Sequence, residues 1–125
     1  MILQEVSGYQ QGLIQESGDN GTLAGGSYFK RIDGLSMSAV LGDYIPYDIT
    51  IIGIAFQRSS TGAGNIEVHD DGVSVASIAV GAALGGSNMT LNADILAGSN
   101  LSTYWNSGTI TSNTQVKVYY KRKAT

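Results

Sequence analysis

An unbroken series of short strand and turn signals runs from Tyr28 to Lys123, and it constrains the fold more than any other feature of the chain. Valine, isoleucine, threonine and tyrosine alternate with small polar residues, while glycine, asparagine, aspartate and serine recur at intervals of roughly ten residues. This spacing is typical of a β-sandwich or a small barrel. No segment keeps the apolar periodicity of a helix. We therefore expect an all-β fold of about eight antiparallel strands, a β-sandwich in jelly-roll-like order.

Two β-hairpins are predicted from turn residues that lie between alternating strands. The stronger signal is Asp70-Asp71-Gly72, because an alternating strand precedes it and another follows it. The second is Asp33-Gly34, a pair suited to a tight primed turn.

Alternation with a period of two residues also predicts which side chains face the core. In the apolar run of residues 49–58, Ile52, Ile54 and Phe56 share one face, and we expect this face to be buried. The last predicted strand, residues 114–121, has one face made of Val116, Val118 and Tyr120 and another made of Lys117, Tyr119 and Lys121.

The first 26 residues are polar and glycine-rich, unlike the rest of the chain. They contain two isolated apolar pairs, Ile2-Leu3 and Leu13-Ile14, and they do not alternate well enough to form a strand throughout. We expect residues 1–26 to form an extended arm with one short strand, and residues 27–125 to form the sandwich domain. Arms of this kind often become ordered only against a neighbouring subunit, so the four apolar residues are candidate docking residues. A frayed terminus is the simpler explanation of the segment.

The composition excludes several classes of function. Charged residues make up 14% of the chain, against about 25% in a typical domain, which favours coverage of the surface by other chains. The formal net charge of −3 argues against nucleic-acid binding, which needs a basic surface. The basic run Lys121-Arg122-Lys123 is interpreted as a solvated strand end. The longest apolar run, residues 51–56, is far too short to cross a membrane.

Residues that could catalyse a reaction or bind a metal are few and poorly spaced. His69-Asp70-Asp71 combines histidine with carboxylates, but adjacent strand residues point to opposite faces, whereas a metal site needs converging ligands. A polar hairpin turn explains these residues better. The glycine-rich stretches lack the lysine and the helix of a phosphate-binding loop. We therefore predict that the protein is not an enzyme and has no catalytic residue, metal site or cofactor.

Two aromatic pairs on late strands are the best candidates for contact residues: Tyr104-Trp105 and Tyr119-Tyr120. Exposed tyrosine and tryptophan anchor protein interfaces and stack on sugar rings. Core packing or a subunit interface is the simpler interpretation of these four residues. Binding of a glycan is the alternative.

Four segments resemble a group of bacteriophage virion proteins in their order and spacing. Residues 44–54 resemble the opening of such domains, in which Pro-Phe/Tyr-Asp precedes a strand. Residues 66–75 resemble a hairpin with glutamate between two apolar residues, and residues 91–102 resemble a strand that begins Leu-Asn-Val-Asp. Residues 116–123 resemble a closing strand with two aromatic residues before a basic end.

The resemblance implies a β-sandwich found at the ends of tail or head fibres and among capsid decoration proteins, commonly as a trimer. No long fibrous stem precedes the domain, which favours a short fibre tip, a small adaptor or a capsid decoration (cement) protein. We expect a homotrimer in the virion that docks through its N-terminal arm to major capsid or tail proteins, without nucleic-acid or membrane partners. The alternative is a receptor- or carbohydrate-binding fibre tip that binds a host surface glycan.

Overall fold

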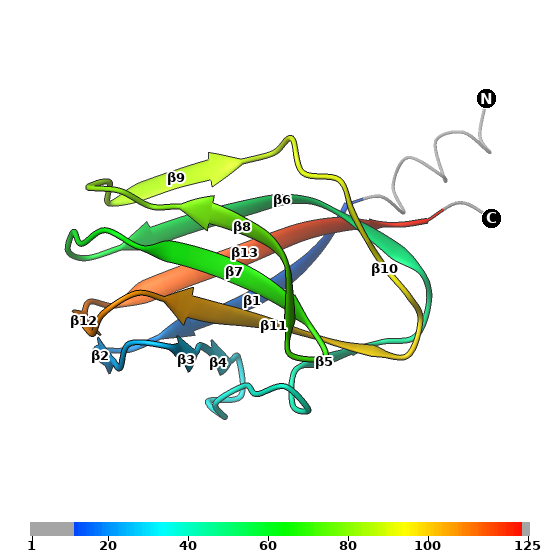
Figure 1. Ribbon diagram of the computed structural model, residues 1–125, viewed down its shortest axis with the longest axis horizontal. Coiled ribbons are helices and arrows are strands. Elements are labelled where there is room, and N and C mark those ends of the chain that lie inside the picture. The colour runs from blue at the N-terminus through cyan, green and yellow to red at the C-terminus, as the bar shows by residue number, and fades with distance from the viewer. Residues whose placement is uncertain (1–11, 124–125) are drawn as a thin grey trace.

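A computed structural model describes residues 12–123, which form antiparallel β-sheets and contain no helix (Figure 1). The predicted docking residues Ile2 and Leu3 lie outside the described residues. The strands are β1 (Leu13–Asp19), β2 (Thr22–Leu23), β3 (Ser27–Tyr28), β4 (Lys30–Arg31), β5 (Asp43–Ile45), β6 (Ile49–Arg58), β7 (Asn65–Asp70), β8 (Val73–Ala79), β9 (Gly85–Asn88), β10 (Ala93–Ile95), β11 (Ser99–Asn106), β12 (Ile110–Thr111) and β13 (Thr114–Arg122).

The strands are arranged in two main sheets. Sheet 1 has the order β10-β6-β13-β1-β4, and β9 also pairs with β6. Sheet 2 has the order β3-β11-β7-β8, and β5 also pairs with β11, while β12 and β2 form a small separate ribbon. Every pairing is antiparallel, so the predicted all-β antiparallel sandwich is confirmed. The described residues form thirteen strands instead of about eight, because short pieces replace several predicted strands.

The pairings are nested along the chain. The first strand, β1, pairs with the last, β13, in sheet 1, and further inward β5 pairs with β11 in sheet 2. Next, β6 pairs with β10 in sheet 1, and the innermost pair is β7 with β8 in sheet 2. Successive pairs therefore alternate between the two sheets, and this nesting brings the N-terminal and C-terminal strands together.

The longest strand, β6, changes the side that it buries partway along its length. Ile51 and Ile54 are both fully buried, although an alternating strand would point them to opposite faces. The register against β13 skips one residue between Ile51 and Gly53, so Ile52 is an extra, bulged residue. The core prediction is confirmed for Ile54 and Phe56 and is wrong for Ile52, which is only partly buried.

Apolar side chains from both sheets fill the interior. The largest fully buried ones are Trp105 and Phe29. The remaining buried apolar residues are Leu23, Met37, Ile45, Ile49, Ile51, Ile54, Phe56, Ile66, Val68, Ile78, Val80, Ile95, Leu101, Ile110, Val116 and Val118. Burial of this apolar area is the main favourable contribution to the stability of the fold.

Strand β1 is unusual because it turns polar side chains inward. Gln15 and Ser17 are buried. Gln15 Nε2 donates to the Leu101 carbonyl at 2.7 Å, and Ser17 Oγ lies 2.7 Å from Thr103 Oγ1. These hydrogen bonds offset the cost of burying polar groups. Because side chains alternate, the same phase turns Ile14 outward, where it is 47% exposed.

The polar N-terminal segment belongs to the sandwich from Leu13 onward. Strand β1 lies between β13 and β4 inside sheet 1, so the expected boundary between an arm (1–26) and a domain (27–125) falls too late in the chain. The segment before the predicted Asp33-Gly34 turn is divided between the sheets, because β3 pairs with β11 in sheet 2 while β4 pairs with β1 in sheet 1. Phe29 is buried where the chain crosses between the sheets.

A turn forms at both predicted places, but only Asp71-Gly72 is primed and closes a full hairpin. Between β7 and β8, Asp71 has a φ of 50° and Gly72 a φ of 87°, and both positive values are those that a primed turn requires. Gly34 also has a positive φ, 88°. Beyond it, residues 35–41 form only an isolated bridge between Ser36 and Lys30.

Candidate functional site

The outer face of sheet 1 carries exposed apolar side chains that begin at the N-terminal strand. Ile14 of β1 lies opposite Tyr119 of β13, and Tyr119 lies opposite Gly53 of β6. Met89 covers Gly53, since a Cβ on that glycine would lie 2.7 Å from Met89 Cε. Ile14 is 47% exposed and Met89 is 48% exposed. We call Ile14, Tyr119 and Met89 the apolar row.

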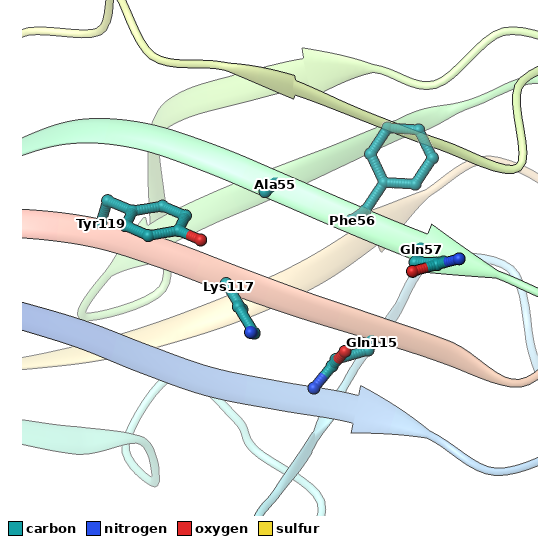
Figure 2. Close-up of a pocket in the computed structure, with 6 residues that line it drawn as sticks. All are labelled: Ala55, Phe56, Gln57, Gln115, Lys117 and Tyr119. Carbon is teal, nitrogen blue, oxygen red and sulfur yellow. The ribbon is translucent and has the colours of Figure 1, made fainter.

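Beside the apolar row, the same face is shallow and nearly balanced in charge. A hollow of about 180 Å³ is lined by Ala55, Phe56, Gln57, Gln115, Lys117 and Tyr119. Figure 2 shows Tyr119, Lys117 and Gln115 following one another along β13, next to the residues of β6. Lys117 lies opposite Glu16 of β1, so the two charges compensate each other. Opposite charges therefore lie next to each other on this face.

The predicted pair Tyr119-Tyr120 is divided between the two sides of sheet 1. Tyr119 lies on the outer face, and Tyr120 is partly buried and packs against the core. Burial raises the pKa of Tyr120, and the neighbouring Tyr47 and Asp43 raise it further. Of this pair, the structure therefore places Tyr119, which is half-buried, on the outer face, and Tyr120 against the core.

The pair Tyr104-Trp105 is divided in the same way in sheet 2. Trp105 is 1% exposed, and its Nε1 donates to the Gly108 carbonyl at 2.6 Å. Its indole therefore serves the core and presents no surface to a ligand or a second subunit. Tyr104 lies on the outer face and is partly exposed. A glycan site at this position would rest on Tyr104 alone.

Tyr104 belongs to a group of side chains on the outer face of sheet 2, which we call the His69 cluster: Tyr28, Glu67, His69, Tyr104 and Asn106. The rings of His69 and Tyr104 stack with centroids 4.6 Å apart, and Tyr28 packs edge-on against both. The Tyr28 hydroxyl lies 3.0 Å from His69 Nδ1, and His69 Nε2 lies 2.8 Å from Glu67 Oε1. Asn106 Nδ2 donates to Glu67 Oε2 at 2.6 Å.

The His69 cluster holds strands together through a chain of hydrogen bonds. Burial raises the pKa of Tyr28, with contributions from Tyr104 and Glu67, which makes its hydroxyl a poor nucleophile. Burial also acts to raise the pKa of Glu67, but hydrogen bonds from His69 and Asn106 outweigh it and lower that pKa. With its proton on Nε2, His69 donates to Glu67 and accepts from Tyr28, which satisfies both ring nitrogens. The cluster thus joins β3, β7 and β11.

The sequence triplet His69-Asp70-Asp71 does not converge on one point. His69 lies in the cluster, whereas Asp71 Oδ1 accepts the Asn100 N–H at 2.8 Å beside the turn. Within residues 12–123, no three histidine, cysteine, aspartate or glutamate side chains gather as a metal site. The one sequence signal for the cluster is the spacing of Glu67 and His69, which places both on one face of a strand.

The C-terminal basic run makes contacts within the chain. Lys123 Nζ lies 2.8 Å from Asp94 Oδ2. This contact favours the charged form of both groups, so it raises the pKa of Lys123 and lowers the pKa of Asp94. The Arg122 guanidinium lies 4.4 Å from the centre of the Tyr47 ring. These contacts agree with the interpretation of this run as a strand end.

Comparison with known proteins assigns no function to these surfaces. No protein-family model matches the chain, and no curated protein matches it. Over the part of the chain that the structure describes, no helix is long and apolar enough to cross a membrane. The apolar row and the faces around it are therefore the features on which a functional proposal rests.

Proposed function

We propose that this protein is a non-enzymatic structural component of a bacteriophage particle. It is a homotrimer in the virion, either a capsid decoration (cement) protein or a short fibre or adaptor, and it docks on major capsid or tail proteins through its N-terminal arm. The resemblance of residues 44–123 to phage virion proteins supports the proposal. The observation that carries it is the apolar row, in which Ile14 and Met89 are about half exposed on the outer face of sheet 1, where the N-terminal strand lies.

The nesting of the strand pairs supports a jelly-roll order for the sandwich. In a jelly roll, a long hairpin wraps so that its successive pairs alternate between two sheets. The pairs β1–β13, β5–β11, β6–β10 and β7–β8 alternate in this way. Viral capsid domains use this architecture as a rigid shell.

Docking at the apolar row follows from the position of β1. The strand begins at Leu13, so an arm that is bound to a partner brings that partner next to Ile14. Burying the exposed half of the Ile14 side chain contributes on the order of 1 kcal/mol per copy. Three copies held in one trimer bind together, which raises the overall affinity well above that of one arm.

The first test is the molar mass of the full-length chain, measured by light scattering after size exclusion. We expect a mass of three chains, each of 13.1 kDa. A single-chain mass throughout the micromolar range would contradict the homotrimer.

The second test is sedimentation of the purified protein with the capsids or the tails of the phage that encodes it. Ile14→Ser should lower the particle-bound fraction several-fold, because it removes exposed apolar surface from the row. Ile32→Ser is the matched control, since Ile32 is 87% exposed and lies outside the row. Equal binding by the two variants would exclude the apolar row as the docking surface.

A further inference from the structure

One continuous stretch of the chain carries no charged side chain. Between Asp71 and Asp94 there is no aspartate, glutamate, lysine, arginine or histidine. This stretch forms β8, β9 and the turn between them; in Figure 1, β9 is the uppermost strand and β8 lies below it. Both strands are next to β6: β9 pairs with it, and β8 contacts it across the sandwich. We call residues 73–88 the uncharged side.

Both strands of the uncharged side present an open edge. Among the strands of residues 12–123, β8 pairs with β7 alone and β9 pairs with β6 alone. The Val80 N–H donates to the Gly64 carbonyl at 2.9 Å. Hydrogen-bonding residues alternate along an antiparallel ladder, so the backbone groups of Ala79 and Ser77 face away from β7. Val75 is an extra residue in the register, and the regular part of the edge therefore runs from residue 76 to residue 79.

The opposite edge of sheet 1 is protected. Strand β4 consists of Lys30 and Arg31, and the chain folds back over it so that Ser36 bridges to Lys30. Charged side chains and covering loops are the usual means of keeping a sheet edge from pairing with another chain. The uncharged side has neither lysine nor proline, and it exposes apolar side chains, with Val73 at 64% and Leu84 at 52%.

The turn between β8 and β9 is held in place from inside the molecule. Arg58 is only 5% exposed, and its Nη2 donates to the Gly81 carbonyl at 3.0 Å. Its Nε donates to the Ala83 carbonyl at 2.8 Å, directly before Leu84. Leu84 is thus presented in a defined position beside β9, and a surface that is ordered in advance loses little conformational entropy on binding.

From these observations we infer that the uncharged side is the contact between copies of this chain, with the β8 edge of one copy beside the β9 edge of the next. The inference rests on the proposed homotrimer and identifies its interface. The occupant is a second copy because each copy offers two different open edges on one side, and a head-to-tail contact between different surfaces forms a ring when its rotation closes, as it does in a trimer. Neither edge brings a charge into the contact, so no charge is buried without a partner.

A matched pair of variants tests the interface. Leu84→Lys places a charge on the uncharged side at a residue that is 52% exposed, and Leu35→Lys makes the same change at one that is 54% exposed, in the turn that follows β4. Light scattering over a range of concentrations measures association of the full chain. We expect association to weaken at least tenfold in Leu84→Lys and to stay at the wild-type value in Leu35→Lys.

Ala79→Pro is an independent second variant. It removes a backbone N–H that faces away from β7, so it leaves the β7–β8 ladder intact while blocking addition of a strand. We expect it to weaken association as Leu84→Lys does. Fluorescence of the buried Trp105, the one tryptophan of the chain, reports whether each variant is folded.

The outcomes separate this inference from the proposed function. A wild-type trimer that persists in folded Leu84→Lys and Ala79→Pro would overturn the inference and leave the homotrimer standing. Equal weakening in Leu84→Lys and Leu35→Lys would also overturn it, because the effect would not depend on the side. A wild-type protein that scatters as a single chain would overturn both the homotrimer and this interface.

Discussion

Among the substitutions of charged residues considered below, Arg58→Met should destabilise the fold most. The buried guanidinium donates three hydrogen bonds to backbone carbonyls: to Gly62 at 2.7 Å, to Ala83 at 2.8 Å and to Gly81 at 3.0 Å. One side chain therefore connects the loop after β6 with the turn between β8 and β9. Burial lowers the pKa of Arg58, in keeping with a charge that has left water.

The magnitude follows from those three hydrogen bonds. A buried hydrogen bond from a charged donor contributes roughly 1.5–3 kcal/mol. The three carbonyls lie in turns and regain water when the guanidinium is removed, so we take about 1 kcal/mol for each. Methionine keeps an apolar stem near the Phe56 ring, which lies 5.7 Å from the Arg58 Cζ. We therefore expect Arg58→Met to lower the free energy of unfolding by about 3 kcal/mol.

Urea denaturation followed by Trp105 fluorescence measures this loss. With an m value of about 2 kcal/mol/M, the midpoint should fall by roughly 1.5 M. All proteins are compared at one concentration, because assembly couples to stability. Arg58→Lys should fall between the wild type and Arg58→Met, since a lysine offers a point charge in place of a fork of donors.

Arg31→Met is the control that measures the effect of removing an arginine from the surface. Arg31 is partly exposed and pairs with Asp33 at 3.2 Å on the surface, so its loss should cost less than about 1 kcal/mol. If Arg58→Met and Arg31→Met lose the same free energy of unfolding, the reasoning about the three carbonyl bonds is wrong. Because Arg58 orders the turn before Leu84, we also expect Arg58→Met to weaken association of the chain.

Three further predictions concern the His69 cluster and the packing of Gly64 against the Trp105 ring. The pKa of Glu67 is lowered from its ordinary 4.5, so its ionised form stabilises the fold above that pH, and this contribution is lost as the pH falls through the lowered pKa. Glu67→Gln should be less stable than the wild type at neutral pH, and its free energy of unfolding should fall less steeply between about pH 5 and pH 3. If the free energies of unfolding of the two proteins fall in parallel with pH, Glu67 does not have this role. Tyr28→Phe removes the hydroxyl beside His69 Nδ1 and should cost about 1 kcal/mol in urea denaturation, and an unchanged midpoint would mean that this bond contributes nothing. Gly64→Ala places a Cβ 2.5 Å from Cη2 of the rigid Trp105 ring and should cost about 1–3 kcal/mol with a change in fluorescence, while wild-type stability would show that the loop moves aside freely.

Where a structural feature depends on neighbours in the chain, the sequence predicted it. Alternation predicted that Ile54 and Phe56 face the core, and both are buried. The Asp71-Gly72 turn followed from residues that tolerate a positive φ. The same local reasoning failed at Ile52, because a bulge shifts the phase of a strand without leaving a mark in its pattern.

The candidate surfaces were predicted only in part. Alternation assigned Tyr119 and Tyr120 to opposite faces, and the structure places Tyr119 on the outer face. It could not show that Trp105 lies in the core, since either face of a predicted strand can be the buried one until the position of the other sheet is known. The His69 cluster draws Tyr28 and Asn106 from strands far apart in the sequence, so no spacing rule identifies it.

The sequence by itself determined that the chain folds as an antiparallel β protein with tight turns, because the period of two and the turn residues act over a few neighbouring positions. Only the tertiary structure decided which strands lie next to one another, and therefore which edges stay open. Those choices depend on contacts between residues that are distant along the chain, such as β1 with β13 and Arg58 with the turn after β8. A stretch without charge is visible in the sequence, but it becomes a candidate interface only when the fold places both of its strands at sheet edges.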